Sequence, residues 1–385
     1  FCTMQISAIA LTEFRNFDQL NINLPAGLIV VHGENAQGKS NIIEAAYMLA
    51  ISKSYRSHID RDLITSGSEN ELGFTLVQGT VNRGDGVVEI GIGIERMLNP
   101  LSGEINLSKH FRVNGVNKRA SEIIGHLNAV LFSPNDIDLV YGTPQIRRRY
   151  LDVLISQIEP EYLRSLQRYQ RILTQRNALL RSIRDGTASK EELEFWDDAL
   201  CLEGANILSS RYRALLQIAP VAEEVHQRMT QTDSRFSVEY LSLLEFCGPP
   251  SHEDLRESML NSLEMVRNRE RILGSTLVGP HRDDIRLSLN GLEMARYASR
   301  GQARISTLSL KLAEGQFFQQ RRGEAPVVLL DDALSELDAT RRRLVLEEAM
   351  RYPQSIVTTA DLDLMASMTN EINLYVHIAQ GKIVD

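Results

Sequence analysis

The residues best suited to chemistry lie in the stretch Gly33-Glu34-Asn35-Ala36-Gln37-Gly38-Lys39-Ser40. The stretch fits G-x-x-x-x-G-K-[ST], a loop whose glycines let successive backbone N–H groups converge on a phosphate. Lys39 would reach the outer phosphates of a nucleoside triphosphate, and the Ser40 hydroxyl would ligate Mg²⁺. We therefore predict that the whole stretch from Gly33 to Ser40 binds ATP together with Mg²⁺.

The segments on either side of this loop predict the context that it needs. Residues 28–32 form a β-branched run typical of a buried strand, and residues 41–50 contain neither Gly nor Pro, as is typical of a helix. The N-terminus of that helix would add partial positive charge beside the phosphates. Ala36 and Gln37 stand where such loops more often have a glycine-containing pair, which costs backbone freedom but no ligand.

A second stretch, Val327-Val-Leu-Leu-Asp331, is followed by Asp332. A buried strand would carry Asp331 to the edge of a sheet, where Mg²⁺ lies beside the β- and γ-phosphates. We predict that Asp331 holds the metal through water, and that Asp332 orients or deprotonates the attacking water. Lys39, Asp331 and Asp332 are thus the predicted catalytic residues, and Ser40 and Asp331 the predicted metal site. Without the glycine loop, a strand that merely ends in a turn carboxylate would explain the pattern equally well.

Composition sets the broad class of the chain. With 385 residues, 43% of them hydrophobic and 24% charged, the chain can bury a large core, which we expect to be divided between two domains. The longest apolar runs, such as residues 326–330, are far too short to span a bilayer, so no membrane partner is expected. The three cysteines, Cys2, Cys201 and Cys247, are scattered without metal-binding spacing, which indicates a reducing cytoplasm.

The predicted secondary structure changes twice along the chain. Residues 1–141 contain alternating strands, with turn signals that include Asn99-Pro100 and predict a β-meander. Residues 142–274 carry helical patterns, and residues 275–385 return to strands mixed with helices. We predict an α/β head split into an N-terminal and a C-terminal lobe, with an α-helical arm inserted between them.

Finer expectations concern the arm and the second lobe. In the arm, one buried helical face is predicted at Leu163, Leu166, Tyr169 or Gln170, and Leu173, and a further helix is expected from about Lys190 to Leu216. In the second lobe, residues Ser275–Gly279 predict a strand, and Asn290-Gly291 predicts a hairpin turn.

Two further elements resemble those of ABC-type ATPases. Ser335-Glu-Leu-Asp338, directly after the Asp331 strand, resembles the D-loop, and Ser299-Arg-Gly-Gln302, 32 residues before Asp331, resembles the ABC signature. An ordinary helix start is the simpler interpretation of the latter when it is taken alone, and a helix N-terminus with a hydroxyl is in either case a good anion site. In this order the elements imply a composite site. One copy would supply the glycine loop and Asp331, and Ser299, Gly301 and Gln302 of a second copy would cap the γ-phosphate, so that ATP binding is linked to formation of a homodimer.

Several longer motifs resemble the RecF family of SMC-like ATPases. They cover nearly the whole chain and are Phe14-Arg-Asn-Phe17, Leu131-Phe-Ser-Pro-Asn-Asp-Ile-Asp-Leu-Val140, Arg147-Arg-Arg-Tyr-Leu-Asp152, Thr276-Leu-Val-Gly-Pro-His-Arg-Asp-Asp284, Ser299-Arg-Gly-Gln-Ala-Arg304 and Leu329-Leu-Asp-Asp-Ala-Leu-Ser-Glu-Leu-Asp338. The resemblance implies an ABC-type ATPase head, built of a P-loop mixed sheet and an antiparallel meander, with Arg15 and Asn16 near the nucleotide. It also implies a cytoplasmic, nucleoid-associated protein of DNA replication and recombinational repair, active in the SOS response to DNA damage. Such a protein would form an ATP-dependent dimer on double-stranded and gapped or single-stranded DNA, and would help RecO and RecR to load recombinase.

The distribution of charge supports contact with DNA. The chain has a net charge of −8, yet residues 147–184 hold nine arginines and three acids, a local net charge of +6. Within them Arg164, Arg168 and Arg171 share one helical face, and such a stripe would bind phosphates independently of sequence. The alternative is a solvated face paired with nearby acids. Three further cations are candidates, namely Lys53, Arg56 and Arg61.

We expect a weak, DNA-dependent ATPase. Asp332 stands where ABC transporters carry a glutamate, and its side chain is one methylene shorter. After the last strand of the sheet, position 359 offers Thr and no histidine that could act as a switch. We therefore predict a turnover below roughly 10 s⁻¹. Three alternatives remain open: a nucleotide-gated DNA clamp with vestigial hydrolysis, another SMC-like ATPase, and the cytosolic ATPase of a transporter. The last has no need of a helical arm.

Overall fold

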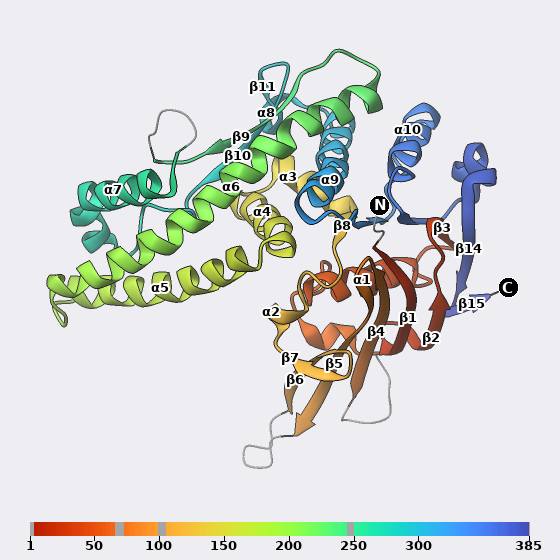
Figure 1. Cartoon of the computed structure of the whole chain (residues 1–385), viewed down its shortest axis with the longest axis horizontal. Helices are drawn as coiled ribbons and strands as arrows, with labels where there is room; N and C mark the ends of the chain where they lie inside the picture. Colours follow the sequence, from red (N-terminus) through yellow and green to blue (C-terminus); the bar gives the residue numbers. More distant parts are fainter. Residues whose placement is uncertain (1–3, 66–72, 99–104, 245–249, 385) are drawn as a thin grey trace. The chain divides into compact units, whose positions relative to one another are not determined.

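The computed structural model of the chain describes residues 4–65, 73–98, 105–244 and 250–384. Cys2, Cys247 and the predicted turn at Asn99-Pro100 lie outside these residues. The chain is divided into two compact units (Figure 1). The first unit is formed by Phe1–Ile137, Glu224–Asp233 and Ser299–Asp385, and the second by Asp138–Glu223 and Ser234–Ala298.

The first unit contains an antiparallel sheet with the strand order β2-β1-β4-β5-β6-β7. Its strands are β1 Gln5–Phe14, β2 Phe17–Asn23, β4 Phe74–Arg83, β5 Gly86–Leu98, β6 Ile105–Val113 and β7 Val116–Lys118. From β4 to β7 each strand pairs with the next one along the chain, so the predicted meander is confirmed.

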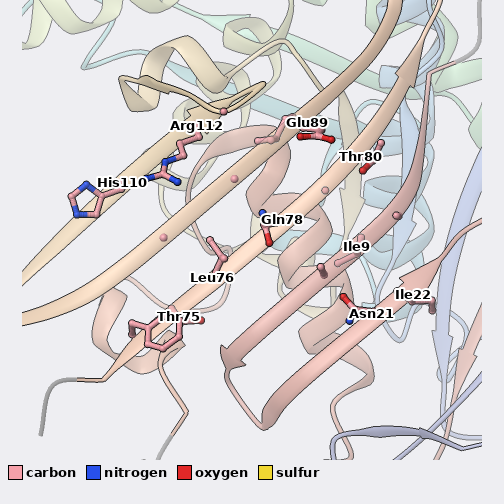
Figure 2. Close-up of a pocket in the computed structure, with 18 of the residues that line it drawn as sticks. Ile9, Asn21, Ile22, Thr75, Leu76, Gln78, Thr80, Glu89, His110 and Arg112 are labelled. Atoms are coloured by element: carbon pink, nitrogen blue, oxygen red, sulfur yellow. The ribbon is translucent and has the colours of Figure 1, made fainter. Parts of the chain in front are cut away.

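One face of this sheet carries a hollow of about 650 Å³ (Figure 2). Gln78 and Thr80 of β4 and Glu89 of β5 line it. Gly91 and Gly93 line it too. A Cβ at either position would meet nothing closer than 3.8 Å, so the absence of side chains at these two residues leaves space in the hollow. No residue of the predicted ATP site lines it.

The second sheet of this unit is mixed and has the order β15-β14-β3-β13-β12-β8. Its strands are β3 Gly27–His32, β8 Ala129–Phe132, β12 Val327–Leu330, β13 Gln354–Thr359, β14 Ile372–Ala379 and β15 Lys382–Val384. All neighbouring pairs are parallel except β14 with β15. The glycine loop follows β3 and Asp331 follows β12, so both emerge at the carboxyl edge of parallel strands, where ligands of such sheets bind.

Helix α1, Lys39–Ile51, packs against both sheets, with contacts to β4 and β13. It is apolar nearly all round, as expected of a helix covered on both sides. At Gly79 of β4 a Cβ would lie 2.3 Å from Cδ1 of Leu49, so a larger residue there would require the Leu49 side chain to move. The remaining helical segments of the unit are 3₁₀ turns at Asp60–Leu63, Pro134–Ile137 and Leu362–Glu371 and the helices α2 Ala120–Ile123, α9 Arg300–Arg322 and α10 Ala339–Ala349.

The second unit is mainly helical, as predicted for the arm. Its elements are α3 Asp138–Tyr141, α4 Pro144–Ile158, α5 Pro160–Arg184, a 3₁₀ turn at Lys190–Glu192, α7 His252–Leu273, α8 Met294–Tyr297 and the sheet β11-β10-β9, formed by β9 Phe236–Leu241, β10 Asp284–Leu289 and β11 Leu292–Glu293. Helix α5 packs on α4 and α7. The long helix α6, Leu193–Thr230, begins in this unit and enters the first unit at Glu224.

The compact units differ from the predicted segments 1–141, 142–274 and 275–385. Residues 275–298 lie with the helical unit, because β10 pairs with β9 of the arm rather than with a strand of the head. The prediction of a strand at Ser275–Gly279 is wrong, since these residues form an irregular, bent segment in which Gly279 has φ 125°. The hairpin at Asn290-Gly291 is present between β10 and β11.

Two predicted helical details also differ. Helix α6 does not end near Leu216 but continues through Pro220 to Thr230. On α5 the predicted Leu173 is buried, and so is Tyr169. In the first turns of the helix, however, Tyr162 and Ser165 are buried in place of Leu163 and Leu166. Within the described ranges, no helix combines the length and the apolar character needed to cross a bilayer.

Candidate nucleotide-binding site

The glycine loop connects β3 directly to α1, and its two glycines are required by its shape. Gly33 has φ 146°, and a Cβ there would lie 2.1 Å from the carbonyl oxygen of Ile378. Gly38 has φ 118°, and a Cβ would lie 2.8 Å from Oδ1 of Asn16. Ala36 also occupies the left-handed region, at φ 64°, which costs a non-glycine residue about 1–2 kcal/mol.

The loop is braced by parts of the chain far from it in sequence. The carbonyl oxygen of Gln37 accepts hydrogen bonds from Nδ2 of Asn16 at 2.8 Å and from the N–H of Gly381 at 3.2 Å. The Gln37 side chain accepts a third, from the N–H of Gln380 at 2.5 Å. The turn of the β14–β15 hairpin therefore holds the loop, a role that no local pattern around Gln380 predicted.

Lys39 lies inside the loop, only 9% exposed. Its ammonium donates to the carbonyl oxygens of Gly33 at 2.8 Å and Glu34 at 2.6 Å. Burial lowers the pKa of Lys39, while the negative charges of Asp332 and Asp331 oppose this shift. A cation held at the centre of a ring of backbone groups is the arrangement that a phosphate-binding loop needs.

The carboxylate of Asp331 collects hydroxyl donors from several elements. Oδ1 accepts from Ser40 Oγ at 2.7 Å and from Thr358 Oγ1 at 2.8 Å, and Oδ2 accepts from the Tyr55 hydroxyl at 2.6 Å. The structure thus brings the predicted pair Ser40 and Asp331 together. A hydroxyl and a carboxylate are oxygen ligands of the kind that Mg²⁺ prefers, with its remaining positions taken by water and phosphate. Among the described residues no cluster of three His, Cys, Asp or Glu side chains could hold a metal without such help.

Asp332 stands beside this carboxylate in a strained backbone, at φ 47°. Its N–H donates to Thr358 Oγ1 at 2.9 Å, so Thr358 fixes both acids. Loss of hydration raises the pKa of Asp332, and the neighbouring Asp331 adds to the rise, which favours a proton-accepting role. Sequence reasoning missed Thr358 and considered only Thr359, whose hydroxyl donates instead to the carbonyl oxygen of Asp361.

The predicted nucleotide residues Arg15 and Asn16 are engaged within the protein. Arg15 forms a bidentate pair with the fully buried carboxylate of Glu44 on α1, at 2.9 and 2.6 Å. Asn16 donates to the loop, and its Oδ1 accepts from Asn41 at 2.7 Å. Both residues therefore hold the glycine loop and the first turns of α1 in place.

The signature-like element begins α9. Ser299 caps the helix, since its hydroxyl accepts from the N–H of Gln302 at 3.3 Å and its own N–H donates to the Gln302 side chain at 2.9 Å. Gly301 is exposed, and a Cβ there would meet no atom within 4 Å. Nothing in the described part of the chain requires a glycine at this position.

Comparisons with known proteins identify the family of the chain. A family model described as RecF/RecN/SMC N terminal domain matches residues 5–383. The DNA replication and repair protein RecF of Roseiflexus castenholzii is 39% identical over 377 residues, which cover 94% of this chain and 95% of that one. The protein of the same name from Halalkalibacterium halodurans is 35% identical over 381 residues, 99% of both chains. The chain belongs to the RecF family.

Solved structures extend the comparison to the fold. A structure described as the recombination mediator protein RecF-ATP in the RecFOR pathway matches with a TM-score of 0.86 at 30% identity, over 99% of this chain and 97% of that one. The Smc head domain of Pyrococcus furiosus, at 18% identity and a TM-score of 0.56 over 99% and 96% of the chains, shares the fold. The RecF-family chain therefore has the predicted ABC-type ATPase head.

The RecF-family motif at Gly279–Asp284 braces the second unit. Arg147 forms a bidentate pair with Asp284 at 2.7 and 2.8 Å, and the Asp283 carboxylate accepts from the Tyr240 hydroxyl at 2.8 Å. Arg211 is nearly fully buried and donates to the carbonyl oxygen of Pro280 at 2.8 Å. These contacts give the motif a structural role within the second unit.

The candidate DNA-binding arginines of α5 have different environments. Arg164 pairs with Glu161 one turn away, and Arg168 pairs with Glu203 at 2.5 Å, as the alternative interpretation expects. Arg171 is exposed and has no ion pair among the described residues. Two other arginines of the basic stretch, Arg147 and Arg176, are internal, so its charge of +6 overstates the cations that are available.

In the first unit the cations after α1 are exposed. Lys53 and Arg61 have no ion pair among the described residues. Arg56 donates to Asn41 at 2.6 Å and lies 3.6 Å from the Glu44 carboxylate. Lys53 and Arg61 are therefore the cations most available to a phosphate backbone.

Proposed function

We propose that this RecF-family chain is an ATP-dependent, DNA-binding switch of recombinational repair. The carrying observation is that the glycine loop, the Ser40–Asp331 pair and the capped start of α9 belong to one unit, while Gly301 presents open space. The open space at Gly301 favours approach of a second molecule, because no contact within the described ranges requires a glycine at this position.

In the proposed site each group of this chain has one task. The loop amides and Lys39 would bind the phosphates, and Ser40 and Asp331 would hold Mg²⁺, which neutralises charge on the β- and γ-phosphates. Asp332, with its raised pKa, would orient the attacking water or accept a proton from it. Ser299, Gly301 and Gln302 of a second copy would cap the γ-phosphate, so dimerisation would follow ATP binding by mass action.

The test of this function is the mass of the full chain in solution, measured by light scattering. We expect a monomer with ADP, a dimer with Mg²⁺-ATP, and a dimer at lower protein concentration when gapped DNA is added. A monomer in all three states would exclude the composite site. Slow release of phosphate, below roughly 10 s⁻¹, is expected during the cycle.

The clamp with vestigial hydrolysis is the second candidate. It is favoured by one observation, that the Thr359 hydroxyl is committed to Asp361 and cannot serve as a switch group. Phosphate release that does not rise above background with gapped DNA, in a chain that still dimerises with ATP, would support the clamp.

Binding to DNA is expected to depend on Lys53 and Arg61. The double variant Lys53→Glu/Arg61→Glu should lower the slope of log affinity against log salt by about 2 on double-stranded and gapped DNA, because one phosphate contact is lost at each position. Fluorescence anisotropy across a salt series measures the slope. Affinity for ATP should stay unchanged, since neither side chain touches the glycine loop.

A control for total charge is the double variant Lys382→Glu/Arg343→Glu, which changes two exposed cations of the same unit. An equal loss of DNA binding in both double variants would mean that net charge, and not this surface, governs binding.

We place RecO and RecR among the partners, since the solved RecF relative is described as part of the RecFOR pathway.

A further inference from the structure

The Asp331 carboxylate accepts one hydrogen bond from a residue outside the nucleotide-binding motifs. Ser40 belongs to the glycine loop and Thr358 to β13, and both donate to Oδ1. The donor to Oδ2 is Tyr55, at 2.6 Å, from the segment that follows α1. Tyr55 belongs to no nucleotide-binding motif, yet it reaches the residue through which the metal would be held.

Tyr55 is itself held on both sides. Its neighbour Ser54 donates to the fully buried carboxylate of Glu44, and the Ser54 hydroxyl accepts from the N–H groups of Arg56 and Ser57, each at 2.9 Å. The other neighbour, Arg56, donates to Asn41 of α1 at 2.6 Å. The tyrosine hydroxyl is therefore placed by a rigid turn and not by a freely rotating loop.

The ring of Tyr55 also packs against a second aromatic ring. It meets the ring of Tyr47 edge-on, with centroids 6.0 Å apart and planes at 84°. A phenol hydroxyl carries its proton at neutral pH, so the Tyr55 hydroxyl acts as a donor to the Asp331 carboxylate. A carboxylate with a donor on each oxygen cannot rotate without losing a hydrogen bond.

We propose that Tyr55 is a positioning residue for Asp331, which fixes Oδ2 so that Oδ1 stays turned toward Ser40 and the site is preformed for a divalent cation. The inference deepens the proposed function and rests on it. Removal of such outer partners of a metal-binding group typically lowers metal affinity by about 10–100-fold. A ring that served only as packing would leave metal affinity unchanged when its hydroxyl alone is removed.

The test is the variant Tyr55→Phe in the full chain. Binding of N-methylanthraniloyl-ATP is followed by fluorescence while Mg²⁺ is titrated, and again in EDTA. We expect the half-saturating Mg²⁺ concentration to rise by about 10-fold, the lower end of the range for such partners. Nucleotide affinity in EDTA and the midpoint of thermal unfolding should match the unaltered chain.

Tyr47→Phe is the matched control, since it removes a hydroxyl from the other ring of the same pair without touching Asp331. A shift below twofold in Tyr55→Phe, or an equal shift in Tyr47→Phe, overturns the proposal. A parallel loss of nucleotide affinity in EDTA overturns it too, because the hydroxyl would then support the whole site. If the unaltered chain fails to bind the nucleotide at all, the proposed function fails and not the role of Tyr55.

Discussion

Gly301→Arg is expected to abolish ATP-dependent dimerisation while leaving the fold intact. The glycine lies in the first turn of α9, and a Cβ would meet nothing within 4 Å, so the chain itself has room for a side chain. Glycine is also about 1 kcal/mol worse than alanine inside a helix, so the replacement should not destabilise α9. In the composite site, however, the same space would be filled by the γ-phosphate and the second copy. We expect the dimer to weaken by roughly 100-fold or more, about 2.7 kcal/mol.

Light scattering with Mg²⁺-ATP measures this effect, and equilibrium binding of ATP to the monomer shows that the glycine loop is intact. Glu253→Arg is the control, because it places the same side chain at the corresponding exposed position of another capped helix, α7. Dimerisation of Gly301→Arg at the normal ATP concentration would show that α9 does not face a second copy.

Arg176→Met is expected to destabilise the second unit by about 3–5 kcal/mol, the usual cost of removing one partner from a buried ion pair. Arg176 is 1% exposed and binds two buried carboxylates, Asp197 at 2.7 Å and Glu270 at 2.6 Å. Its third donor reaches the Thr276 hydroxyl at 2.8 Å. Methionine would fill most of the volume but leave Glu270 buried without its cation. Asp197 would keep only Arg267, which lies 3.0 Å from its Oδ2.

Chemical denaturation followed by circular dichroism measures the loss. Arg171→Met, on the exposed side of the same helix, is the matched control and should change stability by less than about 0.5 kcal/mol. Arg176→Lys keeps the charge but makes fewer hydrogen bonds, so its loss of stability should lie between those of Arg176→Met and Arg171→Met. A loss below about 1 kcal/mol in Arg176→Met would mean that water or a rearrangement compensates the two acids.

The contrast between Arg171 and Arg176 marks a limit of sequence reasoning. Both arginines belong to one basic stretch, and local charge counted them equally. Their fates differ because the acids that neutralise Arg176 come from α6 and α7, far along the chain. The same reason applies to the first turns of α5, where Tyr162 and not Leu163 is buried and the Tyr162 hydroxyl donates to Asp152 of α4 at 2.5 Å.

Elements whose chemistry is local in sequence were predicted well. The β3–loop–α1 unit, the strand before Asp331 and the capped start of α9 each depend on residues within a few positions of one another. The meander was also predictable, since short turns join strands that are neighbours along the chain. The boundary at residue 275 was not, because the pairing of β10 with β9 spans the whole of α7.

By itself the sequence determined which groups are available: a phosphate-binding loop, two adjacent acids, a helix start with a serine and a glycine, and the motifs of the RecF family. Only the tertiary structure decided how they are held. The hydroxyls of Tyr55 and Thr358 on Asp331, and the Gln380-Gly381 turn under the glycine loop, come from segments separated by up to several hundred residues. Side chains and backbone groups so far apart meet through the packing of sheets and helices, which leaves no periodicity or spacing to be read along the chain.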